Sequence, residues 1–486
     1  MAGSEVIISM EELHEMRKVI QVKATSGSTI SRQERFDSIR KAKHNNTSRP
    51  QTPKTRIQKV PSVMRHIILQ DTKDGGKYFE PMMVSIGPYH HGTDKLAPGE
   101  ELKRKLTQQF FSDHEKLIEV LYEKILQEIQ NLRDCYDVES TTKYDDEALA
   151  WMLFVDGCSV LSYIHLCVES GEPDEYKLKN HEIAFVRQDL FLLENQLPFQ
   201  VLEFLMSEEV IQFKEGMEMI KKFILMIVTT PERRGWRQQW RKRWQQCQQL
   251  CQQLRQKCWK QQQQQDNLEL PTEEKPSHLL ELLRKTLIGE PEGSGADTGK
   301  KENDWQSFRD VTELRAAGIH LKRSKTHFLL DVSFTPRFIF GYLRLPPIVV
   351  DDSTKAKFLN LIAYEMCPDF DNKFEVTSYI CFLDSLIDQA DDVKKLRKKC
   401  ILHNFLGSDE EVAKLFNEIA TDLVPSPDIY RHVKAGIQKH YDDIGKAWIA
   451  EFVHSHLSSP WTVIAFIAAV TAFALSIVPY VHKDQK

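Results

Sequence analysis

Apolar residues recur every three or four positions along most of the chain from Val60 onward, a pattern that predicts a mainly helical protein. Residues 149–168 form a nearly continuous apolar run with one charge, which predicts a helix buried on all sides. Further helices are expected at 102–132, 189–205 with a break at Pro198, 211–228, 311–317, 355–367, 378–389, 392–405 and 429–456.

Local signals add one helix start and a few strands to this pattern. Ser408, followed three residues later by Glu411, predicts an N-cap for a helix over 408–423. Short apolar runs bounded by turn residues predict strands at 66–70, 82–85, 327–334 and 338–350. The fold class expected is therefore a mainly α body with a few short β-strands, followed by one C-terminal transmembrane helix.

The membrane prediction rests on the last apolar stretch, Trp461–Val481, which has 21 residues and no charge. A helix of this length spans about 31 Å, close to the hydrocarbon core of about 30 Å. Trp461 and Tyr480 lie near its two ends, where interfacial aromatic residues belong, and Phe466 lies within it. We therefore expect a single transmembrane helix over 460–481, with the lipid bilayer as its partner.

The orientation of this span is a separate question. The N-terminus has no apolar run of signal-peptide length, so we expect a tail anchor at the plasma membrane with the bulk of the chain in the cytosol. Lys483 and Lys486 beyond the span favour the opposite orientation. Ala468, Ala472 and Ser476 recur every fourth position, a spacing that lets two helices approach closely and predicts a homodimer.

Composition divides the rest of the chain. Residues 1–59 hold 12 Lys and Arg against 6 Asp and Glu and predict a disordered basic arm. The helical body is expected in two parts, 60–232 and 305–456, and a short tail, 482–486, follows the span. The intervening 233–304 is expected to be an insertion that ends in a flexible, Gly-containing linker.

Within this insertion, residues 233–265 contain nine Lys and Arg, fourteen Gln, four Trp and no Asp or Glu. A short coiled-coil-like seam, with spacings of four and three, runs through Trp240, Trp244, Cys247, Cys251, Leu254 and Cys258. Three interpretations remain open: an exposed insertion, a basic amphipathic helix at 233–260 that binds a membrane surface or a calmodulin-like partner, and a nucleic-acid contact.

The whole chain holds 65 Lys and Arg against 70 Asp and Glu, a balance that argues against a dedicated nucleic-acid-binding protein. Its nine cysteines form no CxxC pair, which argues against a zinc module or a disulfide framework and favours buried, reduced thiols. P-loop, GxGxxG, GxSxG, HExxH and protein-kinase motifs are absent from the sequence. We therefore expect no cofactor and no metal.

The sharpest candidate for chemistry is a loop with two adjacent histidines, made of Gly87, Pro88, Tyr89, His90, His91 and Gly92. The two imidazoles could bind a metal or transfer protons, or their rings could bond to the backbone of a structural loop. Asp351 and Asp352 could likewise bind a metal, but they fit better as the cap of the helix that follows.

Two further polar groups interrupt apolar helical patterns. Asp156, Gly157 and Cys158 lie inside the run 149–168, where the thiol is either a nucleophile or a buried side chain.

Glu194, Asn195 and Gln196, shortly before Pro198, need hydrogen-bond partners if they are buried. They could link the two parts of the body or cap a helix end.

These motifs resemble those of a large plant-specific family designated domain of unknown function 247. The matching stretches include Val84–Gly92, Phe154–Cys158, Asp189–Phe199, Glu313–Gly318, Asp331–Phe334, Phe358–Glu365, Gly407–Val412 and the Pro460–Trp461 pair. Their order agrees from about residue 60 to the C-terminus, whereas the Gln/Trp/Arg segment is outside the shared pattern. The resemblance implies a mainly helical fold with one C-terminal membrane helix. Grass members implicated in pollen self-incompatibility imply a recognition role.

The sequence thus favours a membrane-anchored plant protein that binds a protein partner and catalyses no reaction. One alternative is a hydrolytic or metal-dependent enzyme that uses His90 and His91. Another is an adaptor that recruits calmodulin-like proteins through 233–260.

Overall fold

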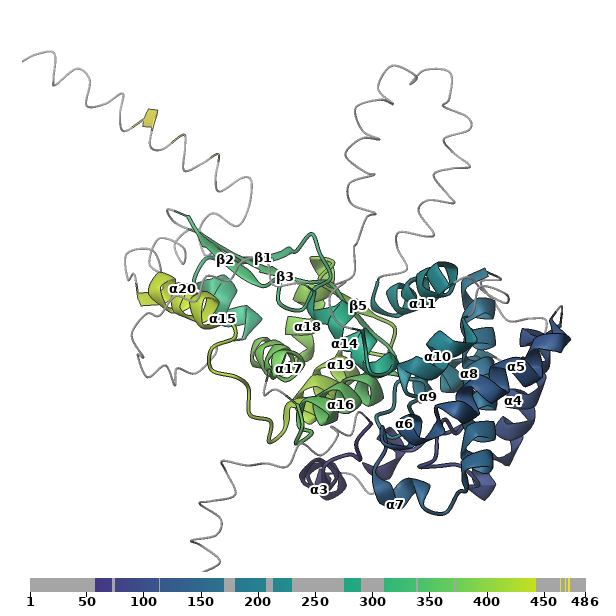
Figure 1. The fold of residues 1–486 in the computed structure, drawn as a ribbon. Helices are drawn as coiled ribbons and strands as arrows, with labels where there is room; N and C mark the ends of the chain where they lie inside the picture. The colour runs from purple at the N-terminus through teal and green to yellow at the C-terminus, as the bar shows by residue number, and fades with distance from the viewer. Residues whose placement is uncertain are drawn as a thin grey trace, which may run out of the picture. The chain divides into compact units, whose positions relative to one another are not determined.

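The computed structural model describes residues 57–71, 75–112, 114–169, 180–206, 213–229, 275–289, 310–337, 340–370 and 373–442, together with Ile464, Ala468, Thr471 and Ala472. All of them belong to one unit, Thr55–Lys486. This part of the chain is mainly helical with a few short strands, as expected (Figure 1).

The first part of the body contains α-helices and three short 3-10 helices, labelled η. They are α3 Ser62–Asp71, η1 Gly75–Tyr78, η2 Asp94–Leu96, α4 Ala97–Phe110, η3 Glu115–Leu117, α5 Ile118–Gln127, α6 Ile129–Arg133, α7 Val138–Thr141, α8 Asp146–Glu169, α9 Asn180–Asp189, α10 Phe199–Leu205 and α11 Phe213–Val228.

The second part adds helices and the strands. They are α14 Leu279–Ile288, α15 Val311–Ala316, β1 Ile319–Arg323, β2 Ser333–Pro336, β3 Gly341–Leu345, β4 Ile348–Val350, α16 Thr354–Glu365, α17 Glu375–Leu386, α18 Ala390–Lys398, β5 Leu402–Asn404, α19 Asp409–Ala420 and α20 Arg431–Asp442.

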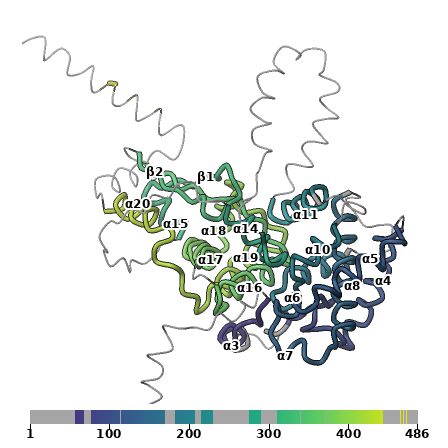
Figure 2. The backbone as a smooth tube through the Cα atoms, viewed as in Figure 1, coloured from purple at the N-terminus to yellow at the C-terminus, as the bar shows by residue number. Residues whose placement is uncertain are grey.

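Helix α8 is the centre of the first part, in contact with α4, α5, α10 and α11 (Figure 2). Among the described residues it is the one helix long and apolar enough to cross a membrane, over Asp146–Val168. However, 83% of its most apolar window is buried inside the protein. This burial fits the helix predicted at 149–168, whose apolar residues face neighbours on nearly every side.

The strands form two small sheets. The larger has the order β1-β3-β2, with β1 parallel and β2 antiparallel to β3, and the smaller pairs β4 with β5 in parallel. Leu321 and Leu343 pair in register and are buried on the inner face. The alternate positions of β1 and β3 are less buried, as the two-residue period of a strand requires.

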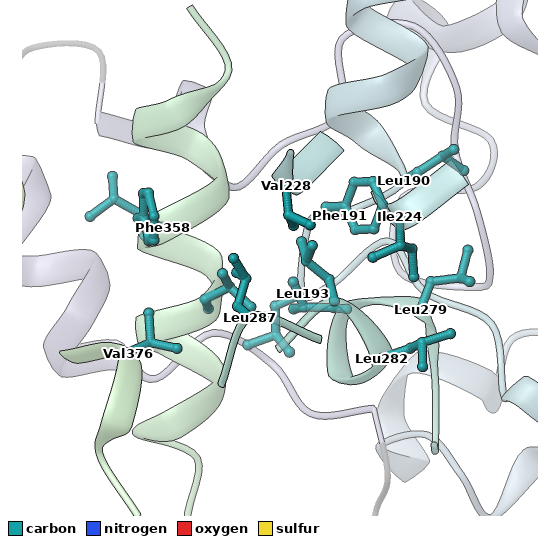
Figure 3. Packing of buried hydrophobic residues seen from close by; sticks show 14 of the residues in the cluster. Leu190, Phe191, Leu193, Ile224, Val228, Leu279, Leu282, Leu287, Phe358 and Val376 are labelled. Carbon is teal, nitrogen blue, oxygen red and sulfur yellow. The ribbon is translucent and has the colours of Figure 1, made fainter. Parts of the chain in front are cut away.

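One hydrophobic core runs through both parts of the body. Figure 3 shows Leu193, from the loop between α9 and α10, near Val228 of α11 and Leu287 of α14. Phe358 of α16 belongs to the same buried cluster. Leu193 and Phe358 are almost fully buried. Burial of each such side chain stabilises the fold by about 1.5–3 kcal/mol, so these contacts join the two parts firmly.

The structure corrects two expectations at the borders of the body. Residues 57–59, assigned to the basic arm, belong to the body: Ile57 is buried, and its N–H donates to Cys135 O at 2.9 Å. Helix α14 lies within the range assigned to the insertion and linker, yet six of its ten residues are buried apolar side chains. The polar composition of the residues around it masked its short apolar pattern. Most of the basic arm and residues 230–274 and 290–309 lie outside the described residues.

Several secondary-structure predictions made from the local sequence pattern were also wrong. Residues 66–70, predicted as a strand, belong to helix α3. The prediction was wrong because an apolar run this short does not distinguish a strand from a helix. The helix expected over 102–132 is divided into α4, η3, α5 and α6. The helix expected over 392–405 ends at Lys398 and is followed by β5. In contrast, Ser408 caps α19 as predicted, since its Oγ accepts the N–H of Glu411 at 3.2 Å.

Candidate functional site

The histidine-containing loop is fixed to α8 at its first residue. Gly87 donates its N–H to Asp156 Oδ2 at 2.8 Å. Its φ of +72° is a conformation that favours glycine, and an added Cβ would lie 2.8 Å from Gln196 O and 2.9 Å from the Tyr136 hydroxyl. The loop therefore requires glycine at this position for both its conformation and its close packing.

Asp156 also forms the centre of a buried ion cluster. Lys103 Nζ of α4 lies 2.6 Å from Asp156 Oδ1, 2.7 Å from Glu100 Oε1 and 2.9 Å from Ser85 O. The side chains of Lys103 and Asp156 are only 2% and 1% exposed. Burial lowers the pKa of Lys103, but the charges of Asp156 and Glu100 outweigh it, so the net pKa is raised. Lys103 is thus a charged ammonium that joins α4, α8 and the extended segment before Gly87.

Residues 82–86, expected to include a strand, are bonded to side chains instead. Asp189 accepts the N–H groups of Met82, Met83 and Val84 at 2.7–2.9 Å. Asn195 continues the pattern: its Oδ1 accepts the N–H of Ile86 at 2.7 Å, and its Nδ2 donates to Val84 O at 3.1 Å. The strand predicted at 82–85 is absent, since Met82 and Met83 lie in a bend, and a carboxylate and an amide rather than a neighbouring strand bond to this backbone.

Glu194 attaches the N-terminal end of the body. Its Oε1 accepts the N–H of Val60 at 2.8 Å, and its Oε2 lies 2.6 Å from the guanidinium of Arg65 on α3. Tyr89 holds the same region, because its hydroxyl donates to Ile57 O at 2.8 Å. These residues therefore bind the chain's own entry segment.

Gln196 satisfies the start of helix α14. Its Oε1 accepts the N–H of Leu280 at 3.0 Å, one of the first-turn amides that have no partner inside a helix. Its Nε2 donates to Leu190 O and Leu192 O, both at 2.8 Å. Residues 190–198 consequently form turns and irregular structure rather than the expected helix, and Pro198 is the N-cap residue before α10, which begins at Phe199.

Asn360 links the second part of the body to the same loop. From α16, its Oδ1 accepts the N–H of Leu193 at 2.8 Å, and its Nδ2 donates to Tyr78 O at 2.7 Å. Of the two roles considered for the polar triplet, Gln196 fulfils both, because it caps the start of α14 and α14 belongs to the second part. Asn360 adds a further link between the parts through the backbone of Leu193.

A second polar junction lies between α14, α16 and α17. Arg284 Nε donates to Glu365 Oε1 at 2.9 Å and its guanidinium pairs with Glu375. The Glu365 carboxylate also accepts the N–H groups of Val376 and Thr377, each at 2.9 Å. The first turn of α17 is therefore capped by a side chain from the preceding helix.

Gly157 and Cys158 serve packing. A Cβ on Gly157 would lie 2.5 Å from Leu205 Cδ1 and 3.0 Å from Val201 Cγ1, so glycine lets α10 approach α8 closely. Cys158 is fully buried, and burial raises the pKa of its thiol well above the ordinary value. A thiolate nucleophile is thus disfavoured at this position.

The two histidines face different carboxylates. His90 Nε2 lies 3.7 Å from Glu194 Oε2, and His91 Nδ1 lies 3.7 Å from Glu100 Oε1. Both of these nitrogens are buried and make no hydrogen bond. Burial lowers the pKa of His90, an effect to which Lys95 and Arg65 add and which Glu194 and Glu80 oppose. The loop ends at Gly92, with φ +80°.

Metal binding was the chemical alternative for this loop and for Asp351. Within the described residues, no group of three or more His, Cys, Asp or Glu side chains could hold a metal ion. Asp351 Oδ1 instead accepts the N–H of Ser353 at 3.1 Å and the hydroxyl of Thr354 at 3.0 Å, in the turn that leads into α16. The N-cap of α16 is Ser353.

Of the membrane segment, the structure describes four residues. Ile464, Ala468, Thr471 and Ala472 are helical and exposed, and the Thr471 hydroxyl donates to Ala468 O at 2.9 Å. The other named positions, Trp461, Phe466, Ser476 and Tyr480, lie outside the described residues, as does the seam from Trp240 to Cys258.

The motif residues thus define a helical body whose halves are joined by buried bonds from side chains to backbone. A family model described as "plant protein of unknown function" (DUF247) matches residues 57–475, and the chain belongs to this family. The UPF0481 protein At3g47200 of Arabidopsis thaliana is 27% identical over 433 residues, covering 82% of this chain and 81% of its own length. A putative UPF0481 protein of the same plant, At3g02645, is 27% identical over 173 residues, or 34% of this chain and 31% of its own. No solved structure matches the chain.

Sequence reasoning found the motif residues but missed most of their partners. Lys103 belongs to an amphipathic helical pattern, in which a charged residue is expected to face solvent. Arg284 lies in the range assigned to the insertion, and Asn360 occupies an otherwise apolar helix. Of these three residues, only Asn360 could have been recognised from the sequence, because a lone amide between apolar neighbours needs buried hydrogen-bond partners.

Proposed function

We propose that the chain is a membrane-anchored interaction protein that catalyses no reaction. The observation that carries this proposal is the uncharged stretch Trp461–Val481, whose described residues are helical and exposed. Ile464 is 57% exposed, and an uncharged apolar stretch of 21 residues has the length that a transmembrane helix requires. The Thr471 hydroxyl bonds to its own helix, which suits a polar group in lipid.

The buried motifs support the non-catalytic half of the proposal. Asp156, Glu194, Asn195 and Gln196 each bond to backbone groups or charges of the body itself. His90 and His91 lie beside separate carboxylates, Glu194 and Glu100, whereas the enzymatic alternative predicts that both rings meet one carboxylate in a single cleft. The family's characteristic polar residues therefore act as structural links, and exposed surfaces are left for a protein partner.

Membrane extraction tests the anchor. The full chain is expected to stay in the membrane pellet after alkaline carbonate treatment. Ala468→Lys with Ala472→Lys is expected to release it, because each lysine near the centre of a span costs about 3 kcal/mol. Leu at the same two positions is the matched control and should remain in the membrane. Recovery of the unmodified chain in the soluble fraction would contradict the proposal.

Partner isolation tests the interaction role. Proteins crosslinked to the detergent-solubilised chain are expected to include a partner whose binding saturates, whereas turnover of a small molecule by the pure chain would contradict the role. The calmodulin alternative at 233–260 remains a prediction. Pull-down of the full chain by calmodulin with and without Ca²⁺ checks it directly.

A further inference from the structure

The outer face of the β1-β3-β2 sheet gathers positive charge. Residues 319–345 contain five Lys and Arg and one acidic residue, Asp331, although acidic residues outnumber basic ones in the whole chain. Two of the five, Lys322 and Arg344, project from the outer face. The Asp331 carboxylate accepts the hydroxyls of Ser324 and Thr326. Asp331 is thus the one carboxylate that this segment holds against five basic residues.

The strand register places the cations in one plane. His320 pairs with Tyr342, and Lys322 pairs with Arg344, so all four side chains project from the face opposite the buried Leu321 and Leu343. Lys322 Nζ lies 3.6 Å from the centroid of the Tyr342 ring. This cation–π contact holds the ammonium group against the face of the sheet.

Neighbouring helices extend the same charge. Arg315 of α15 and Lys399 after α18 are exposed, and with Lys322 they act on His320, whose pKa is lowered by burial and by these three cations. No carboxylate contributes to that shift. We call Arg315, His320, Lys322, Tyr342, Arg344 and Lys399 the cationic sheet face.

We propose that the cationic sheet face docks onto anionic lipid headgroups of the membrane that holds the C-terminal span. This inference rests on the proposed membrane anchor. A cytosolic leaflet is negatively charged and flat, which matches a flat array of cations around a tyrosine, a residue enriched at membrane interfaces.

The tether allows this contact. Helix α20 contacts β2 and ends at Asp442 (Figure 1), and the 18 residues between Asp442 and Trp461 can bridge at most about 65 Å. The sheet is therefore confined near the bilayer, at a high effective concentration of headgroups, so weak electrostatic attraction suffices.

Amine acetylation of the full chain in vesicles tests the docking. Flotation first establishes that the chain is anchored; a chain that does not float contradicts the proposed function itself. In floated chain, Lys322 is expected to react more slowly in vesicles of phosphatidylcholine with phosphatidylserine than in phosphatidylcholine alone. The exposed Lys116 serves as the internal control and should react equally. High salt should abolish the difference, since the Debye length is about 3 Å at 1 M. If Lys322 of the floated chain reacts at the same rate in both kinds of vesicle, the docking proposal is wrong, whereas the proposed membrane anchor is still supported.

Charge variants sharpen the test. Arg344→Gln is expected to weaken the protection of Lys322 roughly fivefold, the ratio that corresponds to about 1 kcal/mol per cation near the surface. Arg104→Gln on α4 is the matched control and should change nothing. Lys399→Gln, at an exposed position outside the sheet, provides a second variant should Arg344→Gln fail to fold. Protection by an acidic phosphopeptide without any effect of phosphatidylserine would assign the face to a protein partner and overturn the lipid proposal.

Discussion

Asn360 and Leu193 are 167 positions apart in sequence, yet the amide oxygen of one accepts the backbone N–H of the other at 2.8 Å. The same Asn360 side chain, which is fully buried, donates to Tyr78 O. One amide on α16 thus holds two separate segments of the first part of the body. The two parts of the body are therefore joined by specific hydrogen bonds in addition to hydrophobic packing.

Asn360→Ala should therefore destabilise the whole body. It leaves the buried Leu193 N–H without its partner, which costs about 1–3 kcal/mol, and it also removes the bond to the half-buried Tyr78 O. Thermal unfolding in detergent is expected to show one transition at a clearly lower temperature. Asn131→Ala removes an exposed amide and should leave the melting temperature nearly unchanged. Similar melting temperatures for the two variants would argue against the link.

The buried pair between Lys103 and Asp156 predicts a strongly non-additive mutant cycle. Lys103→Met leaves a buried carboxylate without its cation and is expected to cost about 3–5 kcal/mol. Adding Asp156→Asn should recover part of this loss, because the uncompensated charge is removed. Denaturant unfolding of the single and double variants measures the coupling.

The same helix offers a control for this cycle. Lys105 and Glu101 form an exposed pair at 2.8 Å, and Lys105→Met should change stability by less than about 0.5 kcal/mol. Comparable losses at Lys103 and Lys105 would show that burial of the first pair has no consequence.

Two glycines of the histidine-containing loop allow the cost of backbone strain to be measured separately from the cost of close packing. Gly87 and Gly92 both have positive φ, but a Cβ on Gly92 meets nothing within 4 Å, whereas one on Gly87 meets Gln196 O. Gly92→Ala should cost only the backbone strain of about 1–2 kcal/mol. Gly87→Ala should cost clearly more in thermal unfolding, and equal losses would contradict the close packing of the loop.

His90 predicts a loss of stability in mild acid. Its folded pKa is lowered by burial, so the unfolded chain binds more protons as the pH falls below about 6.5. The stability that depends on the neutral ring is complete above that pH and is lost as the pH falls. His90→Gln should therefore show a smaller drop in melting temperature between about pH 7 and about pH 5 than the unmodified chain. His114→Gln, at an exposed imidazole, should behave like the unmodified chain.

Sequence pattern predicted the helical class and the buried helix α8, because long apolar periodicity reports burial directly. It also predicted that Glu194, Asn195 and Gln196 need buried partners. It did not predict that Asp189 and Asn195 would replace a neighbouring strand for residues 82–86, since such pairing depends on contacts about a hundred positions away. The strand prediction for the short run 66–70 was wrong because local sequence preference alone does not decide the structure of so short a segment.

Helices α11 and α14 contact each other, so the chain that leaves after α11 returns to the same helix at α14. The entropy of closing a loop between two such fixed ends rises by only about 0.6 kcal/mol for each doubling of its length. This position therefore suits the insertion of a fluorescent protein or an affinity tag, which would leave both chain ends and the apolar stretch 461–481 untouched for imaging in cells.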